Sequence, residues 1–144
     1  MASATVLYTP QVLALAASLS DWSWNDSLPL QATVRSKSCG STLTMGLSTD
    51  ANGRIDRLCV KAHACAIGQA AAAIFARSAI GLSGADVART EQQLGMWLAG
   101  QGAIPDWPGL DLLDAARAYP ARHGAIMLAW QAARQLLPTG DMPR

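Results

Sequence analysis

The stretch Ser36–Ala73, SKSCGSTLTMGLSTDANGRIDRLCVKAHACAIGQAAAA, decides the fold of this chain. At positions 42–47, leucine and methionine alternate with polar or small residues. This alternation is the period of a strand with one buried face. The Asn52-Gly53 pair follows, and it favours a tight reversal because both residues tolerate a positive φ. The first half of the stretch therefore predicts a strand that enters a hairpin turn.

The second half of the stretch predicts the returning strand and then a helix. Residues 54–62 place Leu58, Val60 and Ala62 on one face. Ile55 is out of phase with this set, which indicates a β-bulge or a late start of the strand. After Cys65 the period changes to an alanine-rich run, and alanine is the strongest helix former. We expect a helix that begins at or near Cys65.

The rest of the chain adds helices around one more strand. Apolar periodicity, capping residues and prolines predict these elements. They are a helix at 8–19, a strand at 30–37, and helices at 85–99, 110–119 and 121–137. Strands segregated from helices predict an α+β fold, with helices on one face of a small three-stranded antiparallel sheet. The length of 144 residues fits a single domain spanning residues 1–144.

Cys39 and Cys65 are candidate functional residues. In a three-stranded meander, Cys39 and Cys65 should lie at the same end of the sheet. A helix N-terminus favours the thiolate of a cysteine, which is the form that attacks and ligates. The pair therefore suggests metal or sulfur chemistry. The competing interpretation is two inert, buried cysteines, since free cysteine often serves as a small core residue.

Composition excludes several other functions. The chain has 11 basic and 10 acidic residues and shows no basic stripe, so we expect no nucleic-acid partner. Hydrophobic residues make up 51%, yet no apolar run approaches the ~20 residues of a membrane span, so we expect no membrane association. Three cysteines do not make a disulfide framework. A reducing, cytoplasmic setting is the simpler expectation.

Several segments together resemble a known family. They are Ser38-Cys39-Gly40, the Asn-Gly hairpin, and the run CVKAHACAIGQAAAAIF at 59–75. The tyrosine-led segment 8–19 and the run YPARHGAIMLAW at 119–130 agree with them. This set is similar to the iron–sulfur cluster assembly scaffolds, namely the NifU N-terminal domain and its IscU- and SufU-like relatives. The similarity extends over nearly the whole chain.

The resemblance implies a scaffold or sulfur acceptor rather than an enzyme. Members of this family take sulfur from a cysteine desulfurase and build a transient [2Fe–2S] cluster on three cysteines beside an aspartate. They then pass the cluster to recipient proteins, and some relatives hold zinc at the same place. Thiolates suit all of these tasks, since they ligate iron–sulfur clusters and zinc and accept persulfide sulfur.

The ligand set implied by the resemblance is incomplete here. Cys39 and Cys65 match the first two cysteines of the family. Ser41 stands at the position of the aspartate, and Ala125 at that of the third cysteine. Gly124 stands where a histidine often precedes that cysteine. Cys39 and Cys65 alone cannot complete a tetrahedral site, so the chain could also bind no metal at all.

Two histidines could complete the site. His63 and His123 lie near the expected position, and imidazole ligates zinc and some clusters. A metal set of Cys39, Cys65 and His123, with or without His63, is therefore a hypothesis beside ordinary surface or capping roles for both histidines. Cys59 should point to the opposite face of the sheet and serve packing. Two alternatives to the scaffold stay open: a binding or regulatory protein that has lost the cluster, and a zinc-binding domain.

Overall fold

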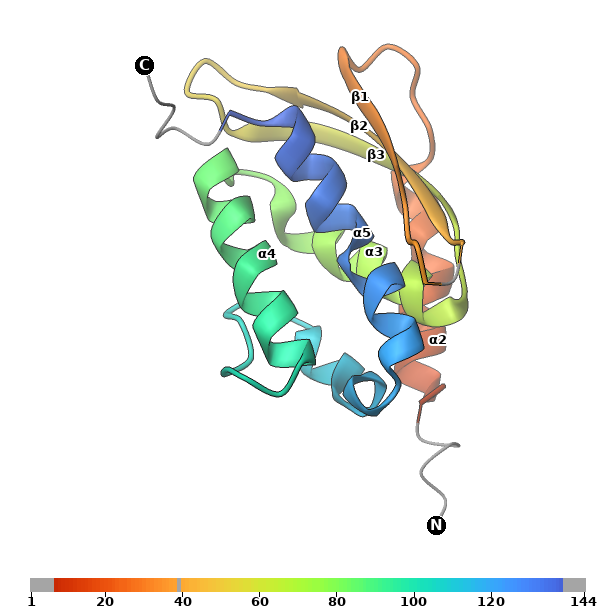
Figure 1. The fold of residues 1–144 in the computed structure, drawn as a ribbon. Coiled ribbons are helices and arrows are strands. Elements are labelled where there is room, and N and C mark those ends of the chain that lie inside the picture. The colour runs from red at the N-terminus through yellow and green to blue at the C-terminus, as the bar shows by residue number, and fades with distance from the viewer. Residues whose placement is uncertain (1–6, 39, 139–144) are drawn as a thin grey trace.

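The structure, a computed structural model, describes residues 7–38 and 40–138. Helices and strands follow one another in the predicted order (Figure 1). They are α2 (Pro10–Ser18), the 3₁₀ helix η1 (Leu19–Trp22), β1 (Leu30–Arg35), β2 (Thr42–Thr49), β3 (Ile55–His63), α3 (Ala66–Ala79), α4 (Gly84–Leu98), the 3₁₀ helix η2 (Leu110–Ala118) and α5 (Pro120–Leu136). The predicted α+β class is confirmed.

The three strands form an antiparallel sheet in the order β1-β2-β3. The apolar positions read from the sequence align across it in rows. Ala32 of β1 pairs with Met45 of β2, and Met45 pairs with Val60 of β3. Met45 is fully buried, because this face of the sheet packs on helices. The predicted hairpin and its alternation are therefore confirmed.

The predicted irregularity at Ile55 is a β-bulge. Ser48 pairs with Arg57, whereas the next residue, Thr49, pairs with Ile55. Asp56 is thus the extra residue on β3, which is the arrangement of a bulge. The bulge returns Ile55 to the core, where only 1% of its surface is exposed.

Helices α3 and α5 pack against the sheet, α4 packs on α5, and α2 packs on α3 (Figure 1). Three aromatic rings lie at the centre of this layer. Phe75 stacks on Trp107 with ring centroids 5.3 Å apart and meets the edge of Trp130 at 5.2 Å. All three side chains are buried, and the Trp107 indole donates a hydrogen bond to the carbonyl of Ile74. Aromatic side chains bury a large apolar area, so this cluster stabilises the helical layer.

The loop before β1 covers the opposite face of the sheet. A Cβ built on Gly46 would lie 2.9 Å from the Cys59 Sγ and 3.5 Å from the ring of Trp24. Leu28 closes the same small cluster, and Lys61 places its ammonium 4.9 Å from the centroid of the Trp24 ring. The expectation that Cys59 packs on the face away from the helices is confirmed, since only 1% of it is exposed.

One helix takes a different form from the prediction. Residues 110–118 form a 3₁₀ helix rather than an α-helix. Pro120 follows directly, and a residue before proline avoids the α conformation. Tyr119 accordingly has φ −121° and ψ 83°, which separates η2 from α5.

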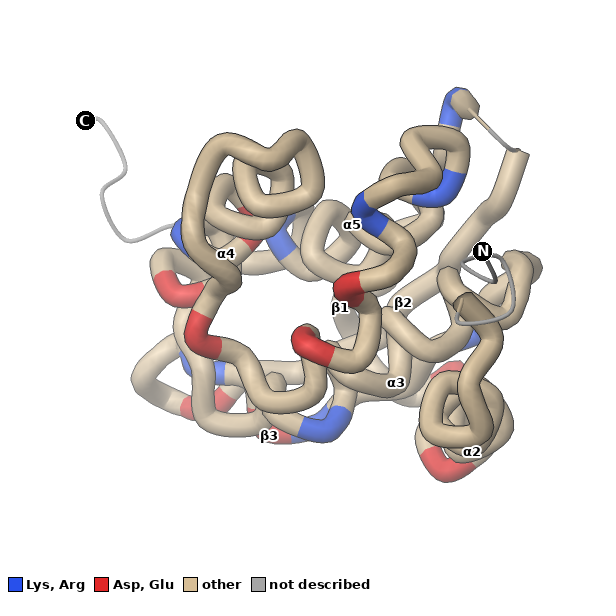
Figure 2. Tube along the Cα trace, turned by 90° about the horizontal axis from the view of Figure 1, so that it is seen from below, with Lys and Arg blue, Asp and Glu red and all other residues tan. Residues whose placement is uncertain are grey.

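Charges of both signs are interspersed over the side shown in Figure 2. None of the helices in the described part of the chain combines the length and apolar character that a membrane span requires.

The start of α4 is a capping box. The Ser83 hydroxyl accepts a hydrogen bond from the Asp86 N–H, and the Asp86 carboxylate accepts one from the Ser83 N–H. The hydrogen bond from the Ser83 backbone is the main cause that lowers the pKa of Asp86, and the Arg89 guanidinium, 2.8 Å away, adds to it.

We expect Ser83→Ala to lower the free energy of unfolding by about 1 kcal/mol, since the variant loses the side-chain cap. The contribution of Asp86 depends on pH. Because its pKa is lower in the folded than in the unfolded state, this contribution is present at neutral pH and is lost as the pH falls through the folded pKa. Urea unfolding at neutral and acidic pH measures both effects. An Asp86→Asn variant with the pH profile of the unmodified chain would contradict the assignment.

Candidate functional site

Three segments that are far apart in the sequence meet at one end of the sheet. They are the β1–β2 turn at 36–41, the start of α3, and the first turn of α5. The strand register brings the first two together, because Thr42 at the start of β2 pairs with His63 at the end of β3. Gly40 lies two residues before Thr42, and Cys65 lies two residues after His63.

The β1–β2 turn is tightly closed. The Ser36 N–H donates to the carbonyl of Ser41 at 2.8 Å, and the Gly40 N–H donates to the carbonyl of Ser36 at 3.0 Å. Gly40 has φ +73°, a conformation that glycine adopts without strain. Strand β1 therefore ends at Arg35, two residues earlier than predicted. Cys39 lies outside the described residues, so its closeness to Cys65 stays a prediction.

Cys65 is the N-cap residue of α3, which confirms that the helix begins directly after it. Its backbone is extended, with φ −65° and ψ 170°, and its side chain makes no capping hydrogen bond. The thiol is half-buried. Gln69 braces this end of the helix, since its N–H donates to the carbonyl of Cys65 and its side-chain amide to that of Ala64, both at 2.9 Å.

The first turn of α5 lies directly against the β1–β2 turn. A Cβ built on Gly124 would lie 2.4 Å from the Ser36 Oγ and 3.0 Å from the Ser38 Oγ. The two hydroxyls are 3.1 Å apart, and the Ser38 Oγ donates to the carbonyl of Ala121 at 3.4 Å. Serine hydroxyls therefore occupy the space that a side chain at position 124 would need.

Position 125 faces the first turn of α3. A Cβ built on Gly68 would lie 3.1 Å from the Cβ of Ala125 and 2.9 Å from that of Ala64. Ala125 is buried, with 1% of its surface exposed. The position at which the resemblance places a third cysteine is thus beside the helix that Cys65 begins. It carries a methyl group, which is no metal ligand.

The two histidines differ in setting. The His123 Nε2 lies 3.0 Å from the carbonyl of Arg117 and donates a hydrogen bond to it, while His63 is exposed at the end of β3. Across residues 7–38 and 40–138, no three cysteine, histidine or acidic side chains form a group that could hold a metal ion. The predicted metal set of Cys39, Cys65 and His123, with or without His63, includes Cys39, which lies outside the described residues. This set therefore stays a prediction. The described residues alone do not fit a resident zinc.

Arg122 connects the first turn of α5 to the segment that leads into α2. Its guanidinium donates a hydrogen bond to the hydroxyl of Tyr8, the residue before the N-cap of α2, at 3.0 Å. This contact joins residues 114 positions apart. It ties the start of α2 to the first turn of α5.

Sequence reasoning missed the packing role of Ser36, Ser38 and Gly68. Serines at alternate positions around Cys39 gave a weak signal of a polar turn. Nothing in the sequence showed that they meet Gly124, because that contact spans more than 80 positions.

We expect Gly124→Ala to lower the free energy of unfolding by about 1–2 kcal/mol, because overpacking outweighs the gain in helix propensity. Gly95→Ala is the matched control, since the nearest atom to a Cβ there is the Met127 Cε at 3.9 Å. That variant should gain about 0.5–1 kcal/mol from helix propensity alone. Chemical unfolding of both variants decides the point. Equal stabilisation by the two substitutions would show that the β1–β2 turn is not docked on α5.

No protein-family model and no curated protein matches the sequence. Solved structures do. A nitrogen-fixing NifU-like protein (N-terminal) from Brucella abortus is 26% identical, with a TM-score of 0.82 over 93% of this chain and 94% of that chain.

A second structure is a putative iron–sulfur cluster assembly scaffold protein for the SUF system, SufU, from Fervidobacterium islandicum. It is 18% identical, with a TM-score of 0.78 over 90% of this chain and 96% of that chain. This chain is therefore similar in fold to both proteins and in sequence to the NifU-like one, over more than nine-tenths of its length.

Proposed function

We propose that this chain accepts sulfur for iron–sulfur cluster assembly and carries it, as persulfide or nascent [2Fe–2S] cluster, on Cys39 and Cys65. The observation that carries the proposal is the position of Cys65. It begins α3 where the β1–β2 turn and the first turn of α5 converge. The similarity to a protein described as a cluster assembly scaffold supports it.

The half-buried Cys65 thiol suits sulfur transfer. Its thiolate would attack the outer sulfur of a persulfide on a cysteine desulfurase. The sulfur–sulfur bond of that persulfide breaks, the desulfurase cysteine leaves as a thiolate, and a persulfide forms on Cys65. No oxidant or reductant is needed, because one sulfur–sulfur bond replaces another.

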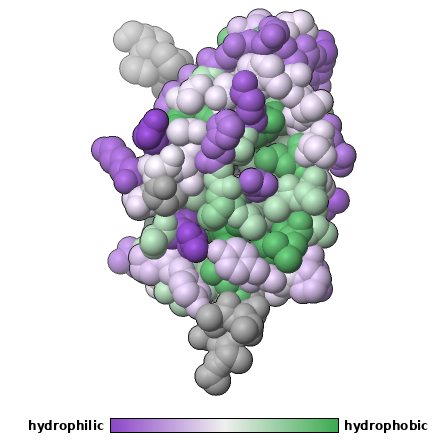
Figure 3. Space-filling model, turned by 90° about the vertical axis from the view of Figure 1, so that its right-hand side faces the viewer, coloured by the Kyte–Doolittle hydropathy of each residue, from purple (hydrophilic) through white to green (hydrophobic). Residues whose placement is uncertain are grey.

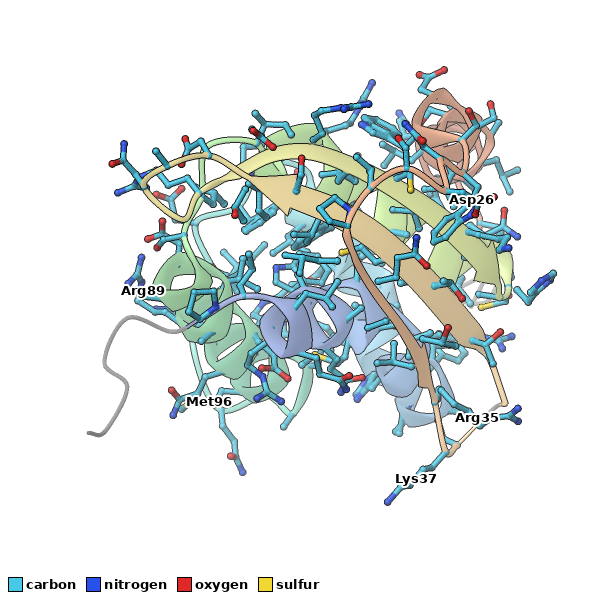
Figure 4. All side chains as sticks on the ribbon, turned by 90° about the horizontal axis from the view of Figure 1, so that it is seen from above. Asp26, Arg35, Lys37, Arg89 and Met96 are labelled. Carbon is cyan, nitrogen blue, oxygen red and sulfur yellow. The ribbon has the colours of Figure 1, made fainter. Side chains whose placement is uncertain are left out.

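The β1–β2 turn brings positive charge to the same end of the molecule. Arg35 ends β1 and Lys37 lies within the turn, and Figure 4 shows both side chains pointing away from the body of the protein. Basic side chains beside a site raise the local concentration of anionic partners. We propose a cysteine desulfurase as sulfur donor and an iron–sulfur recipient protein as acceptor. The chain then acts as a carrier and not as an enzyme.

The side chains at the site fit a persulfide or cluster that is held briefly better than they fit a permanently bound metal. Ser41 offers a neutral hydroxyl and Ala125 a methyl group, so the two cysteines lack the two further ligands of a closed tetrahedral site. A cluster is therefore cargo in this proposal, held only until transfer.

Anaerobic incubation with cysteine and a desulfurase, with and without iron and a thiol reductant that converts persulfide sulfur to sulfide, tests the proposal. We expect the visible absorbance of a [2Fe–2S] cluster or a persulfide detectable by mass spectrometry, and its loss in Cys65→Ser. Cys59→Ala is the matched control, since the Cys59 thiol is buried on the other face of the sheet. Loss of sulfur in Cys59→Ala alone would contradict the assignment of the site.

A second function is favoured by the contact between Gly124 and Ser36. This contact fills space beside the expected ligand positions, as expected of a binding or regulatory protein that keeps the fold without the cluster. Such a protein would bind the desulfurase without taking up sulfur. The same incubation separates the two functions, because binding without sulfur on any cysteine would support the second.

A further inference from the structure

Helix α2 presents an outer face without charge. The segment from Thr9 to Ser20 contains no acidic or basic residue. Its exposed residues are Pro10, Gln11, Leu13, Ala14, Ala17 and Ser20. Leu13 projects from this face with 48% of its surface exposed. A surface helix normally shows charged and polar residues to solvent, so this face is typical of one that meets another protein.

Two grooves flank the helix. Beside its C-terminal half, a groove of about 340 Å³ runs between α2, β3 and α3, with Ala17, Val60 and Ala62 in its lining. Beside its N-terminal half, a groove of about 270 Å³ is lined by Ala14, Arg77 and other residues of α2, α3 and η2. Figure 3 looks onto the side of the molecule where α2 lies in Figure 1 and shows a broad apolar area there. Leu13 thus projects from a face with a groove on either side, a shape that can pack against a surface of the same shape.

The two ends of this face carry opposite charges. Arg77 lines the groove beside the N-terminal half of α2, whereas Asp21 lies in η1, just past the C-terminal end of the helix. Both side chains are exposed, and neither forms an ion pair within residues 7–38 and 40–138.

We propose that a second copy of this chain docks on this face, with the two α2 helices antiparallel about a twofold axis. A twofold contact uses the same patch on both copies. In the antiparallel arrangement, Asp21 of one copy meets Arg77 of the other, twice. The uncharged centre then buries no unpaired charge, and Leu13 of each copy enters a groove of the other.

The size of the face predicts a weak dimer. From Pro10 to Trp22, α2 and η1 span 13 residues, which corresponds to about 20 Å of helix. Such a contact lies at the small end of specific interfaces, below roughly 1,200 Å² of total buried surface. We therefore expect a dimer that forms and dissociates with protein concentration.

Sedimentation equilibrium over a wide concentration range tests the proposal. The full chain should show a reversible monomer–dimer equilibrium. Leu13→Lys should raise the dissociation constant at least about 100-fold, since each copy loses a buried leucine and gains a charge. Met96→Lys is the matched control, because Met96 is 45% exposed but lies on α4. Circular dichroism confirms that both variants fold.

A charge exchange tests the arrangement itself. Arg77→Asp should weaken the dimer several-fold, and adding Asp21→Arg should restore most of the loss, because the exchanged pair again has opposite signs. A monomer at all concentrations would overturn the proposal. A dimer that survives Leu13→Lys, or one that Met96→Lys weakens equally, would overturn it too. A dimer broken by Arg77→Asp and not restored by Asp21→Arg would exclude the antiparallel geometry.

Discussion

The double variant Ser41→Asp/Ala125→Cys is expected to bind zinc at least about 100-fold more tightly than the unmodified chain. Structural zinc sites with four ligands reach apparent binding energies of about 10–16 kcal/mol. If four ligands share this energy equally, each contributes roughly 2.5–4 kcal/mol. A difference of about 1.4 kcal/mol corresponds to a factor of ten in the dissociation constant. Two further anionic ligands beside Cys65 should therefore have a large effect.

Both substituted positions lie at the end of the sheet where α3 begins. The Ala125 side chain faces Gly68 in the first turn of α3, where the neighbouring residue carries no side chain. Ser41 is buried in the β1–β2 turn at the same end of the sheet. Competitive titration with a chromophoric chelator measures the affinity.

The control for this variant is Ser41→Asp/Ala129→Cys, which adds the same groups with the thiol one turn further along α5. It should gain little. Equal gains in the two double variants would show that position 125 does not belong to the site. Tight zinc in the unmodified chain would show that His63 or His123 completes the site.

Phe75→Ala should lower the free energy of unfolding by about 3–5 kcal/mol, which is the usual cost of removing a buried aromatic side chain. Phe75 is fully buried and contacts both Trp107 and Trp130 through its ring. For a chain of this length, the melting temperature should fall by roughly 10 °C or more. Calorimetry or chemical unfolding measures the effect.

Two comparisons sharpen that experiment. Phe75→Leu keeps most of the apolar volume and should cost less than about 1.5 kcal/mol. A chelator should leave the melting temperature of the unmodified chain unchanged, since we expect the core and not a metal to hold the fold. A large loss of stability on chelation would show that a metal contributes to folding. Equal losses for the two Phe75 variants would show that the aromatic cluster is not the source.

The local elements could be predicted from the sequence because their causes are local. The Asn52-Gly53 turn and the bulge at Ile55 each follow from residues a few positions apart. Cys65 at the head of α3 belongs to the same group, since the change of period marks the helix start. The α+β class then follows from the order of the elements.

The contacts between distant segments could not be predicted. Gly124 meets Ser36, and Arg122 binds Tyr8, across separations that no periodicity records. The 3₁₀ form of η2 depends on how the chain enters α5 at Pro120. The site itself was therefore only half predictable: the sequence indicates Cys65 and positions 41 and 125, while the packing that joins them is tertiary.

Peptide-mapped mass spectrometry after incubation with an active cysteine desulfurase and cysteine tests the central claim most directly. The proposed function predicts one added sulfur atom on Cys65, alone or together with one on Cys39, and none on the buried Cys59. Sulfur found on Cys59 alone, or on no cysteine while the desulfurase turns over, would contradict it.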